Sequence, residues 1–262
     1  MRLTRVLAIT ATASFTTAVA AQDTVRMGTE GYYPPFNYFD SAGEIKGFDI
    51  DIGNALCDAM EVECEWVTTD WDGIIPALNS NKFDTIIASM GITEERAEIV
   101  SFSEPYYFNA ARFVASKDLG LDSAMPSDLE GMIVGAQSGT LEVSMLDTYF
   151  PDTDVKLYPK LDDALLDLET GRVDLVLAGQ FVVGDWLAGQ DGACCEFVGD
   201  AFMADGMSGT GIAVRQEDEA LREKLNAALD QIIEDGTYGE IRARYFDFDI
   251  MTRPKTAGEL FN

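Results

Sequence analysis

The feature that most constrains the fold is a repeated alternation between segments of strand character and segments of helical periodicity. In residues 61–66 charged and apolar side chains alternate, as in a half-buried strand, and in residues 47–60 the apolar side chains share one helical face. Strands that alternate with helices in this way favour a parallel α/β sheet covered by helices. The strands expected in this series are 24–28, 62–66 and 85–88, and the helices are 47–60 and one that opens at Trp71.

A second series of the same kind begins after residue 130, and residues 217–234 then carry apolar side chains at helical spacing. Ligands in parallel α/β sheets bind beyond the carboxyl ends of strands. Glu30, Trp71 and Ser89 each come just after an expected strand, so we expect them to meet at one sheet edge. The expected elements of the second series are strands 132–136 and 173–178 and helices that begin near Thr140 and Leu161.

Composition narrows the functional classes. The 262 residues suffice for one large domain or for two lobes with separate cores. A net charge of −28 argues against nucleic-acid binding. The chain contains no histidine, which excludes Ser-His-Asp and Cys-His catalysis and argues against a metal site. We therefore expect neither a metal nor a cofactor.

The N-terminus has the pattern of a secretory leader. Arg2 and Arg5 form a basic start, residues 6–18 are modestly apolar, and Ala18-Val-Ala20 fits a cleavage site. The apolar run is too short, and too rich in threonine and serine, to span a bilayer. We expect residues 1–21 to be removed, which changes the net charge from −28 to −30 and leaves a soluble exported protein.

The four cysteines fall into two close pairs. Cys57 and Cys64 lie near the end of a helix and the start of a strand, a spacing that suits a local disulfide in an exported protein. Cys194 and Cys195 are adjacent, so they either form a strained vicinal disulfide or remain as two thiols. We favour the disulfide for the second pair as well.

Residues 88–96, Ala-Ser-Met-Gly-Ile-Thr-Glu-Glu-Arg, have the pattern of an anion site. They follow an apolar strand and open a helix, for which Thr93 is a suitable N-cap. Backbone N–H groups at the helix start, the Ser89 hydroxyl and the Arg96 guanidinium can therefore converge on one point. A surface arginine after an ordinary loop is the alternative, and neighbouring motifs decide between the two.

Six motifs occur in order along the chain, and together they resemble the polar-amino-acid family of periplasmic solute-binding proteins. The closest resemblance is to the branch that binds lysine, arginine, ornithine and histidine, and it covers nearly the whole chain after the leader. The motifs are Gly28-Thr-Glu-Gly-Tyr-Tyr-Pro-Pro-Phe36, Gly47-Phe-Asp-Ile-Asp-Ile52, Asp70-Trp-Asp72, the 88–96 segment, Phe102-Ser-Glu-Pro-Tyr-Tyr107 and Gly135-Ala-Gln-Ser-Gly-Thr140.

This resemblance implies a two-lobed periplasmic binding protein fold. Each lobe is expected to hold a parallel-dominated sheet flanked by helices, with two crossing segments as a hinge that closes around ligand. The first lobe is expected to comprise residues 22–109 and 206–262, and the second residues 110–205. The resembled branch also carries a disulfide at the place of Cys57 and Cys64.

The resemblance further implies the ligand contacts. Arg96 matches the arginine that pairs with the ligand α-carboxylate, and planar bidentate geometry explains that choice. The other matched positions are Ser89, Gly91 and Thr140 for hydrogen bonds, Tyr33 and Trp71 for an aromatic sandwich around the ligand side chain, Glu30 for a distal cation, and Glu142 as a helper one helical step beyond Thr140.

Two positions depart from the family pattern. Gly91 stands where the family has serine or threonine. Gly179 stands where the family has an aspartate that accepts the ligand α-amino group. We expect Glu142 or Gln180 to substitute, or the ligand to carry a modified amino group, and we expect Gly179→Asp to strengthen the binding of simple arginine.

The function that the resemblance implies is that of a periplasmic binding component of an amino-acid ABC importer. It would bind a polar, cationic amino acid, act as a monomer and deliver its ligand to a membrane permease. One alternative is a binder of opines or other N-modified amino acids. Another is a cyclohexadienyl dehydratase-like enzyme, for which Glu30 or Glu142 would be the acid, but an acidic end suits a cationic ligand better. We expect no enzymatic activity.

Overall fold

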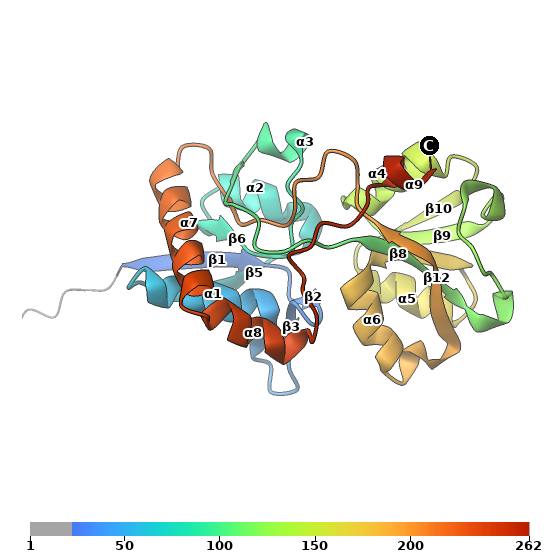
Figure 1. Ribbon diagram of the computed structural model, residues 1–262, viewed down its shortest axis with the longest axis horizontal. Coiled ribbons are helices and arrows are strands. Elements are labelled where there is room, and N and C mark those ends of the chain that lie inside the picture. The colour runs from blue at the N-terminus through green and yellow to red at the C-terminus, as the bar shows by residue number, and fades with distance from the viewer. Residues whose placement is uncertain (1–22, 262) are drawn as a thin grey trace, which may run out of the picture.

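The computed structural model describes residues 23–261, which form two lobes side by side, each built on a five-stranded sheet (Figure 1). The leader expected at residues 1–21 lies outside the described residues. The sheet of the first lobe contains, in spatial order, β5 (Glu63–Thr68), β1 (Thr24–Thr29), β6 (Thr85–Ile86), β13 (Ala213–Val214) and β7 (Ser101–Phe102). The sheet of the second contains β10 (Asp154–Tyr158), β9 (Ile133–Gln137), β11 (Leu175–Gly179), β8 (Ala111–Ser116) and β12 (Cys195–Phe202). A small third sheet comprises β2 (Tyr32–Tyr33), β3 (Asn37–Phe39) and β4 (Ile45–Lys46).

Both large sheets combine parallel and antiparallel pairing. β1 pairs in parallel with β5 and β6, and β9 pairs in parallel with β10 and β11. Every antiparallel pairing in these two sheets involves β8 or β13, which enter their sheets directly after the chain has crossed from the other lobe. β8 and β13 begin at the cleft, whereas their neighbours in the sheet end at the cleft. The two kinds of strand therefore run in opposite directions. The expected two-lobed α/β fold with parallel-dominated sheets is confirmed, since in each large sheet only β13 or β8 runs against the other strands.

Helices pack on the sheets of both lobes (Figure 1). In the first lobe α1 packs against α7 and α8, and in the second α5 and α6 pack against β11. Across residues 23–261, no helix combines the length and the apolarity that a bilayer crossing requires. The helices are α1 (Phe48–Ala59), α2 (Ile74–Asn79), α3 (Glu94–Ala97), α4 (Leu141–Tyr149), α5 (Leu161–Glu169), α6 (Gln180–Ala188), α7 (Glu219–Glu234), α8 (Thr237–Tyr245) and α9 (Ala257–Phe261), with short 3₁₀ turns at Trp71–Gly73, Lys117–Leu119, Pro126–Asp128 and Asp191–Cys194.

Helix α1 begins at a position that only glycine fits. Gly47 has a φ of 127°, and a Cβ atom there would lie 2.1 Å from the carbonyl oxygen of Phe36. Glycine adopts this backbone conformation without steric cost, whereas a side chain would be strained and would collide. The close approach brings the start of α1 against the loop that follows β1, which is the first of the loops that form the cleft.

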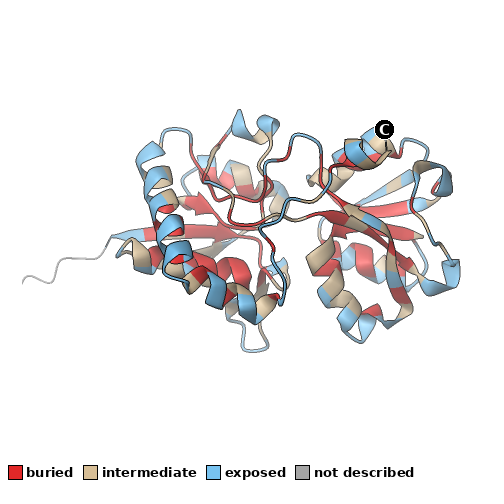
Figure 2. Ribbon diagram, viewed as in Figure 1, coloured by how far each residue is buried: buried red, intermediate tan, exposed pale blue. Residues whose placement is uncertain are grey.

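Burial follows the strands and the inward sides of the helices (Figure 2). Every residue of β11 is buried, because this strand lies in the middle of its sheet and is covered on both faces. β5 lies at an edge, and its exposed and partly buried positions largely alternate, as the pattern of residues 61–66 predicts. The two strands therefore differ in sequence because they differ in the number of covered faces.

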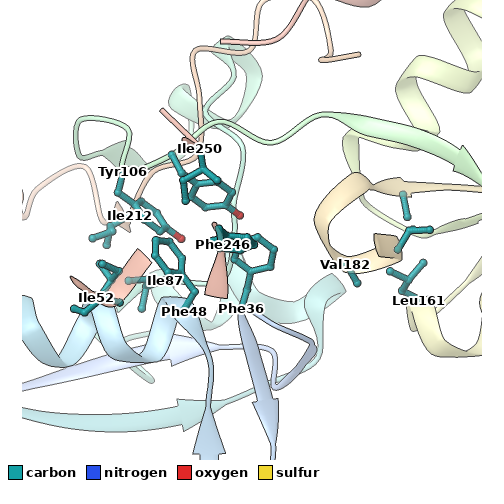
Figure 3. Close-up of a cluster of buried hydrophobic side chains, with 14 of the residues drawn as sticks. Phe36, Phe48, Ile52, Ile87, Tyr106, Leu161, Val182, Ile212, Phe246 and Ile250 are labelled. Atoms are coloured by element: carbon teal, nitrogen blue, oxygen red, sulfur yellow. The ribbon is translucent and has the colours of Figure 1, made fainter. Parts of the chain in front are cut away.

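An aromatic cluster fills the region where the lobes meet. The ring of Phe36 stacks on that of Tyr107 with centroids 5.0 Å apart, and Phe181 of α6 lies 5.3 Å from Phe246. Figure 3 shows Phe36, Phe48 and Phe246 together on the first lobe, facing side chains of the second. The aromatic loop 28–36 thus serves two purposes, since Phe36 packs into this core while Tyr33 lines the cleft described below.

The C-terminal segment crosses to the second lobe. The N–H of Phe108 donates to the carbonyl of Ile250, and the N–H of Met203 donates to that of Lys255, both at 2.8 Å. Phe261 of α9 then packs 4.9 Å from Phe202, completing an aromatic cluster of the second lobe. The expected division assigned residues 206–262 to the first lobe, but the contacts of this last helix lie with the second. Three chain segments therefore connect the lobes, where two were expected (Figure 1).

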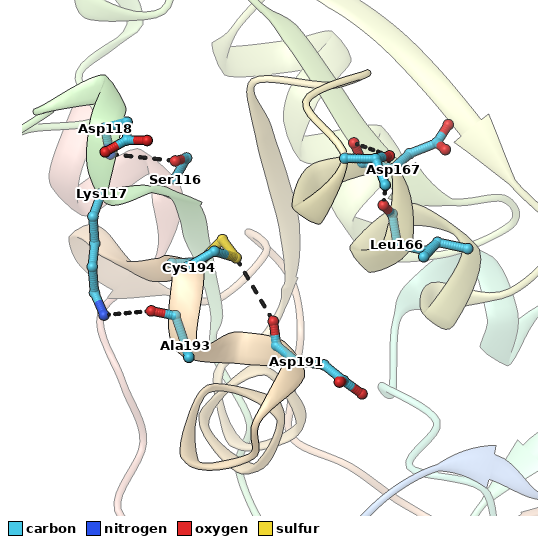
Figure 4. The surroundings of a disulfide bond; sticks show 10 residues. Ser116, Lys117, Asp118, Leu166, Asp167, Asp191, Ala193 and Cys194 are labelled. Atoms are coloured by element: carbon cyan, nitrogen blue, oxygen red, sulfur yellow. Dashed lines mark hydrogen bonds between the residues drawn. A yellow bond between two sulfur atoms is a disulfide. The ribbon is translucent and has the colours of Figure 1, made fainter.

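Both cysteine pairs form disulfides. Cys57 and Cys64 join the end of α1 to β5, as expected, across a sequence separation of 7. Cys194 and Cys195 are also bonded to each other, at the start of β12. Figure 4 shows this second pair beside Ala193, whose carbonyl oxygen accepts a hydrogen bond from Lys117 Nζ at 2.9 Å.

We expect removal of the first disulfide to cost moderate stability. The double substitution Cys57→Ser, Cys64→Ser should lower the free energy of unfolding by about 2–3 kcal/mol, because the bridge closes a short loop in the unfolded chain. Urea unfolding of the oxidised protein measures this loss. The same double substitution at Cys194 and Cys195 is the control, since that pair encloses almost no chain; an unchanged urea midpoint for the first variant would contradict the expectation.

Candidate ligand-binding cleft

A cavity lies between the lobes and is lined by residues of both. The structure places eight of the nine predicted ligand-binding residues around it: Glu30, Tyr33, Trp71, Ser89, Gly91, Arg96, Thr140 and Glu142. The ninth, Gly179, ends β11 and lines a smaller recess that shares Tyr33, Thr140 and Glu142 with the cavity. Loops that lie far apart in the sequence thus converge on one space, as the positions after the expected strands predict.

Arg96 is held at one end of the cavity by carbonyl groups and an aromatic ring. Thr93 caps helix α3 as predicted, and Arg96 Nη1 donates to the carbonyl oxygen of Gly91 at 3.0 Å. Its guanidinium carbon lies 5.5 Å from the centroid of the Trp71 ring. In the described part of the chain no carboxylate forms a salt bridge with Arg96. Burial lowers the pKa of Arg96, and an unpaired cation in such a place suits an anionic ligand group.

Direct hydrogen bonds join the two lobes beside Arg96. The carbonyl oxygen of Gly139, from the second lobe, accepts hydrogen bonds from Trp71 Nε1 at 3.2 Å and from Arg96 Nη2 at 3.3 Å. Ser138 Oγ donates to the Asp72 carboxylate at 2.9 Å. Gly139 has a φ of +68°, and a Cβ atom there would lie 3.0 Å from Asp72 Oδ1. Glycine therefore allows the second-lobe loop to approach the first lobe this closely.

Glu30 is a buried carboxylate that also lines the cavity. It is 5% exposed, and its Oε1 accepts a hydrogen bond from Gln137 Nε2, on the second lobe, at 2.7 Å. Burial raises its pKa to about 7, a shift that the Gln137 hydrogen bond opposes. Because this pKa lies above that of Glu30 in the unfolded chain, the folded protein keeps the proton on Glu30 up to a higher pH. Glu30 thus lowers stability as the pH rises from about 4.5 to about 7.

Ser89 is fixed from behind by a buried carboxylate. Its hydroxyl donates to Asp49 Oδ2 at 2.9 Å, and Ser89 adopts a left-handed backbone conformation with a φ of 56°. The hydroxyl hydrogen is therefore already used, so Ser89 Oγ offers its lone pairs to a ligand. Asp49 lies in the first turn of α1, and its side chain positions this loop.

Neighbouring side chains fill the space beside the two glycines that depart from the family pattern. A Cβ atom on Gly91 would lie 2.8 Å from Leu141 Cδ1. A Cβ atom on Gly179 would lie 2.4 Å from Tyr33 Oη and 2.6 Å from Asn109 Nδ2. Neither glycine leaves an empty space, so a side chain cannot simply be added. Gln180, which was expected as a possible substitute, lines a groove behind the hinge and not the cavity.

Several cavity residues were not found from the sequence. For Gln137, the sequence signal that could have marked it as a site residue was its position directly after an expected strand. The others are Met145 on α4 and residues on or beside the two segments that cross between the lobes, and nothing local marks them as site residues; they are Asn109, Ala110, Ala111, Met145, Met203, Ala204, Met207 and Thr210. Within residues 23–261 no group of histidine, cysteine, aspartate or glutamate side chains is arranged to hold a metal ion.

Comparison with known proteins identifies the family. Residues 25–248 match the bacterial extracellular solute-binding proteins, family 3. This chain belongs to that family. It is 39% identical over 236 residues to the ABC transporter arginine-binding protein 1 of Escherichia coli (strain K12), covering 89% of this chain and 95% of that protein.

Solved structures agree with this assignment. An ancestral arginine-binding protein bound to arginine is 37% identical, with a TM-score of 0.80 over 86% of this chain and 99% of that one. A periplasmic His/Glu/Gln/Arg/opine family-binding protein from Silicibacter pomeroyi, in complex with lysine, is 36% identical, with a TM-score of 0.77 over 87% and 99%. The similar proteins are two-lobed binding proteins, and this chain has their fold.

We expect Glu30 to titrate near neutral pH, and Gln137→Ala to raise its pKa further. Gln137 donates to the carboxylate and so stabilises the charged form, while burial disfavours it. Carboxyl ¹³C chemical shifts followed by NMR across pH 4–9 measure both values. Glu63, exposed on β5, is a control carboxylate in the same spectra; a Glu30 pKa that falls in the Gln137→Ala variant would contradict the expectation.

Proposed function

We propose that this protein is the periplasmic substrate-binding component of an amino-acid ABC importer and binds a cationic amino acid of the arginine, lysine and ornithine class. The observation that carries the proposal is the charge arrangement of the cavity. Its charged lining residues are Arg96, Glu30 and Glu142. One cation and two anions match a ligand with one carboxylate and two cationic groups, and each buried charge then has a partner.

In this proposal Arg96 pairs with the ligand α-carboxylate, together with backbone N–H groups of the Ser89 loop. Trp71 and Tyr33 flank the ligand side chain, whose apolar stem and cationic head both suit aromatic faces. Glu30 receives the distal cation. The similar proteins named above, two of which are described as arginine-binding and one as in complex with lysine, support this ligand class.

We further propose the context in which the protein acts. The leader directs it to the periplasm, where it acts as a monomer and delivers its ligand, unchanged, to a membrane permease. The lobes divide near residues 109 and 206, with the tail after 250 attached to the second lobe, and they close around the ligand. The hydrogen bonds of Gly139 and Gln137 across the cleft support such a closed form.

An N-modified amino acid, such as an opine, is the second candidate ligand. Gly91 and Gly179 offer no side chain to an α-ammonium group, and Met145, Met203 and Met207 give the cavity an apolar side. Against this, the additional carboxylate of an opine has no second cationic side chain in the cavity lining. A dehydratase-like activity would need Glu30 or Glu142 to act as an acid on a substrate of the arogenate type.

A panel of ligands tests the proposal. We expect arginine, lysine or ornithine to raise the melting temperature of the purified mature protein, because a ligand that binds only the native state stabilises it, by about 2.7 kcal/mol at 100 times its Kd. Glutamate and leucine are the control ligands, and N-(1-carboxyethyl)arginine represents the opines. Stabilisation by the opine alone, or turnover of arogenate in a parallel assay, would overturn the assignment.

We expect Arg96→Ala to lower the affinity for the cationic amino acid by about 2–5 kcal/mol, because one partner of a desolvated charge pair is lost. Isothermal titration calorimetry measures the loss, and an unchanged melting temperature without ligand shows that the fold survives. Arg222→Ala is the matched control, since Arg222 lies on α7 and pairs with Glu219 far from the cavity. Equal affinity in the Arg96 and Arg222 variants would refute the carboxylate role.

A further inference from the structure

The α-ammonium group of an amino-acid ligand has no partner at the position where the family pattern places one. Gly179, at the end of β11, has no side chain. An ammonium group in a closed cleft is costly unless it is paired or hydrogen-bonded. The proposed function, on which the following inference rests, therefore requires an acceptor from another element.

Asn109 occupies the space that a residue-179 side chain would fill. β8 and β11 pair so that Gly179 lies opposite Ala111, and the N–H of Gln180 donates to the carbonyl of Ala110 at 2.8 Å. This pairing brings the crossing segment that carries Asn109 directly against the end of β11. The Asn109 Nδ2 atom would lie 2.6 Å from a Cβ atom on Gly179. Asparagine at 109 and glycine at 179 are thus complementary in shape.

The side-chain oxygen of Asn109 is available as an acceptor. Asn109 lines the cavity, and its Oδ1 atom is buried without any hydrogen-bond partner. The amide nitrogen lies on the side of the Tyr33 hydroxyl, since a Cβ atom on Gly179 would lie 2.6 Å from Asn109 Nδ2 and 2.4 Å from Tyr33 Oη. This orientation turns the nitrogen toward Tyr33 and leaves the oxygen free. A buried acceptor without a partner is costly, and a ligand N–H group removes that cost.

Glu142 supplies the negative charge that Asn109 lacks. It lines both the main cavity and the recess that contains Gly179, so it reaches the same region from helix α4. It also lies close enough to raise the pKa of Tyr33, for which it is the largest contribution from a charged group. Glu30, the other carboxylate of the cavity, is already bound to Gln137.

We propose that the ligand α-ammonium group donates to Asn109 Oδ1 and is neutralised by the Glu142 carboxylate, which together replace an aspartate at position 179. The acceptor and the charge come from two side chains on different elements. It follows that Gly179→Asp does not strengthen the binding of arginine, as the sequence suggested. It weakens binding, because the new side chain must displace both Tyr33 and Asn109.

The test compares two ligands that differ only at the α-position. L-arginine carries the α-ammonium group, and 5-guanidinopentanoate is the same molecule without it. Calorimetric titration of both into the wild type, Asn109→Ala and Glu142→Gln separates contacts with the ammonium group from all others. We expect each variant to weaken L-arginine by roughly tenfold or more, as for a lost hydrogen bond to a charged group, and to leave 5-guanidinopentanoate within about twofold.

Gln180→Ala is the matched control, because Gln180 follows Gly179 directly but lines the groove behind the hinge. Equal losses for the two ligands, or no loss for either, would overturn the inference and leave the proposed function standing. A gain of L-arginine affinity in Gly179→Asp would also overturn it. If the wild type binds neither ligand and also fails to bind lysine and ornithine, the proposed function fails, and the inference fails with it.

Discussion

One buried carboxylate, that of Asp49, connects the segments that form the cleft. Its oxygens accept hydrogen bonds from Tyr106 at 2.6 Å and from Asn37 and Ser89 at 2.9 Å each. Tyr106 belongs to the first segment that crosses between the lobes, Asn37 to the small sheet of β2, β3 and β4, and Ser89 to the 88–96 segment, called here the ligand loop. Burial raises the pKa of Asp49 to about 6, and the three donors oppose that shift. The charge is tolerated only while all three segments are in place, because a buried carboxylate that loses its donors is strongly destabilising.

The position of Asp49 explains why the ligand loop can be strained. A non-glycine residue in the left-handed region, such as Ser89, costs on the order of 1–2 kcal/mol and persists where its surroundings hold it. The hydrogen bond to Asp49 holds the side chain of Ser89, which itself lines the cavity. The loop is thereby held in place before a ligand arrives, which reduces the cost of binding.

Much of this architecture followed from local sequence pattern. Helix α1, the cap at Thr93 and the convergence of Glu30, Trp71 and Ser89 were predicted because periodicity, capping chemistry and strand ends are local properties. Asn109 and Met207 were not, since their role depends on which strand lies opposite them. The partner of Asp49 at Tyr106 lies 57 residues away. The docking of α9 depended on an aromatic cluster assembled from several elements, which no window of sequence contains.

The third connection between the lobes changes the mechanics of the joint. Two connecting segments that run close together would leave the lobes free to twist as well as to bend relative to each other. The segment from Ile250 to Lys255 adds a further attachment, tied to Phe108 on one side and to Met203 on the other. Three tethers that are anchored at different points restrict the twisting of one lobe against the other more than two neighbouring tethers would.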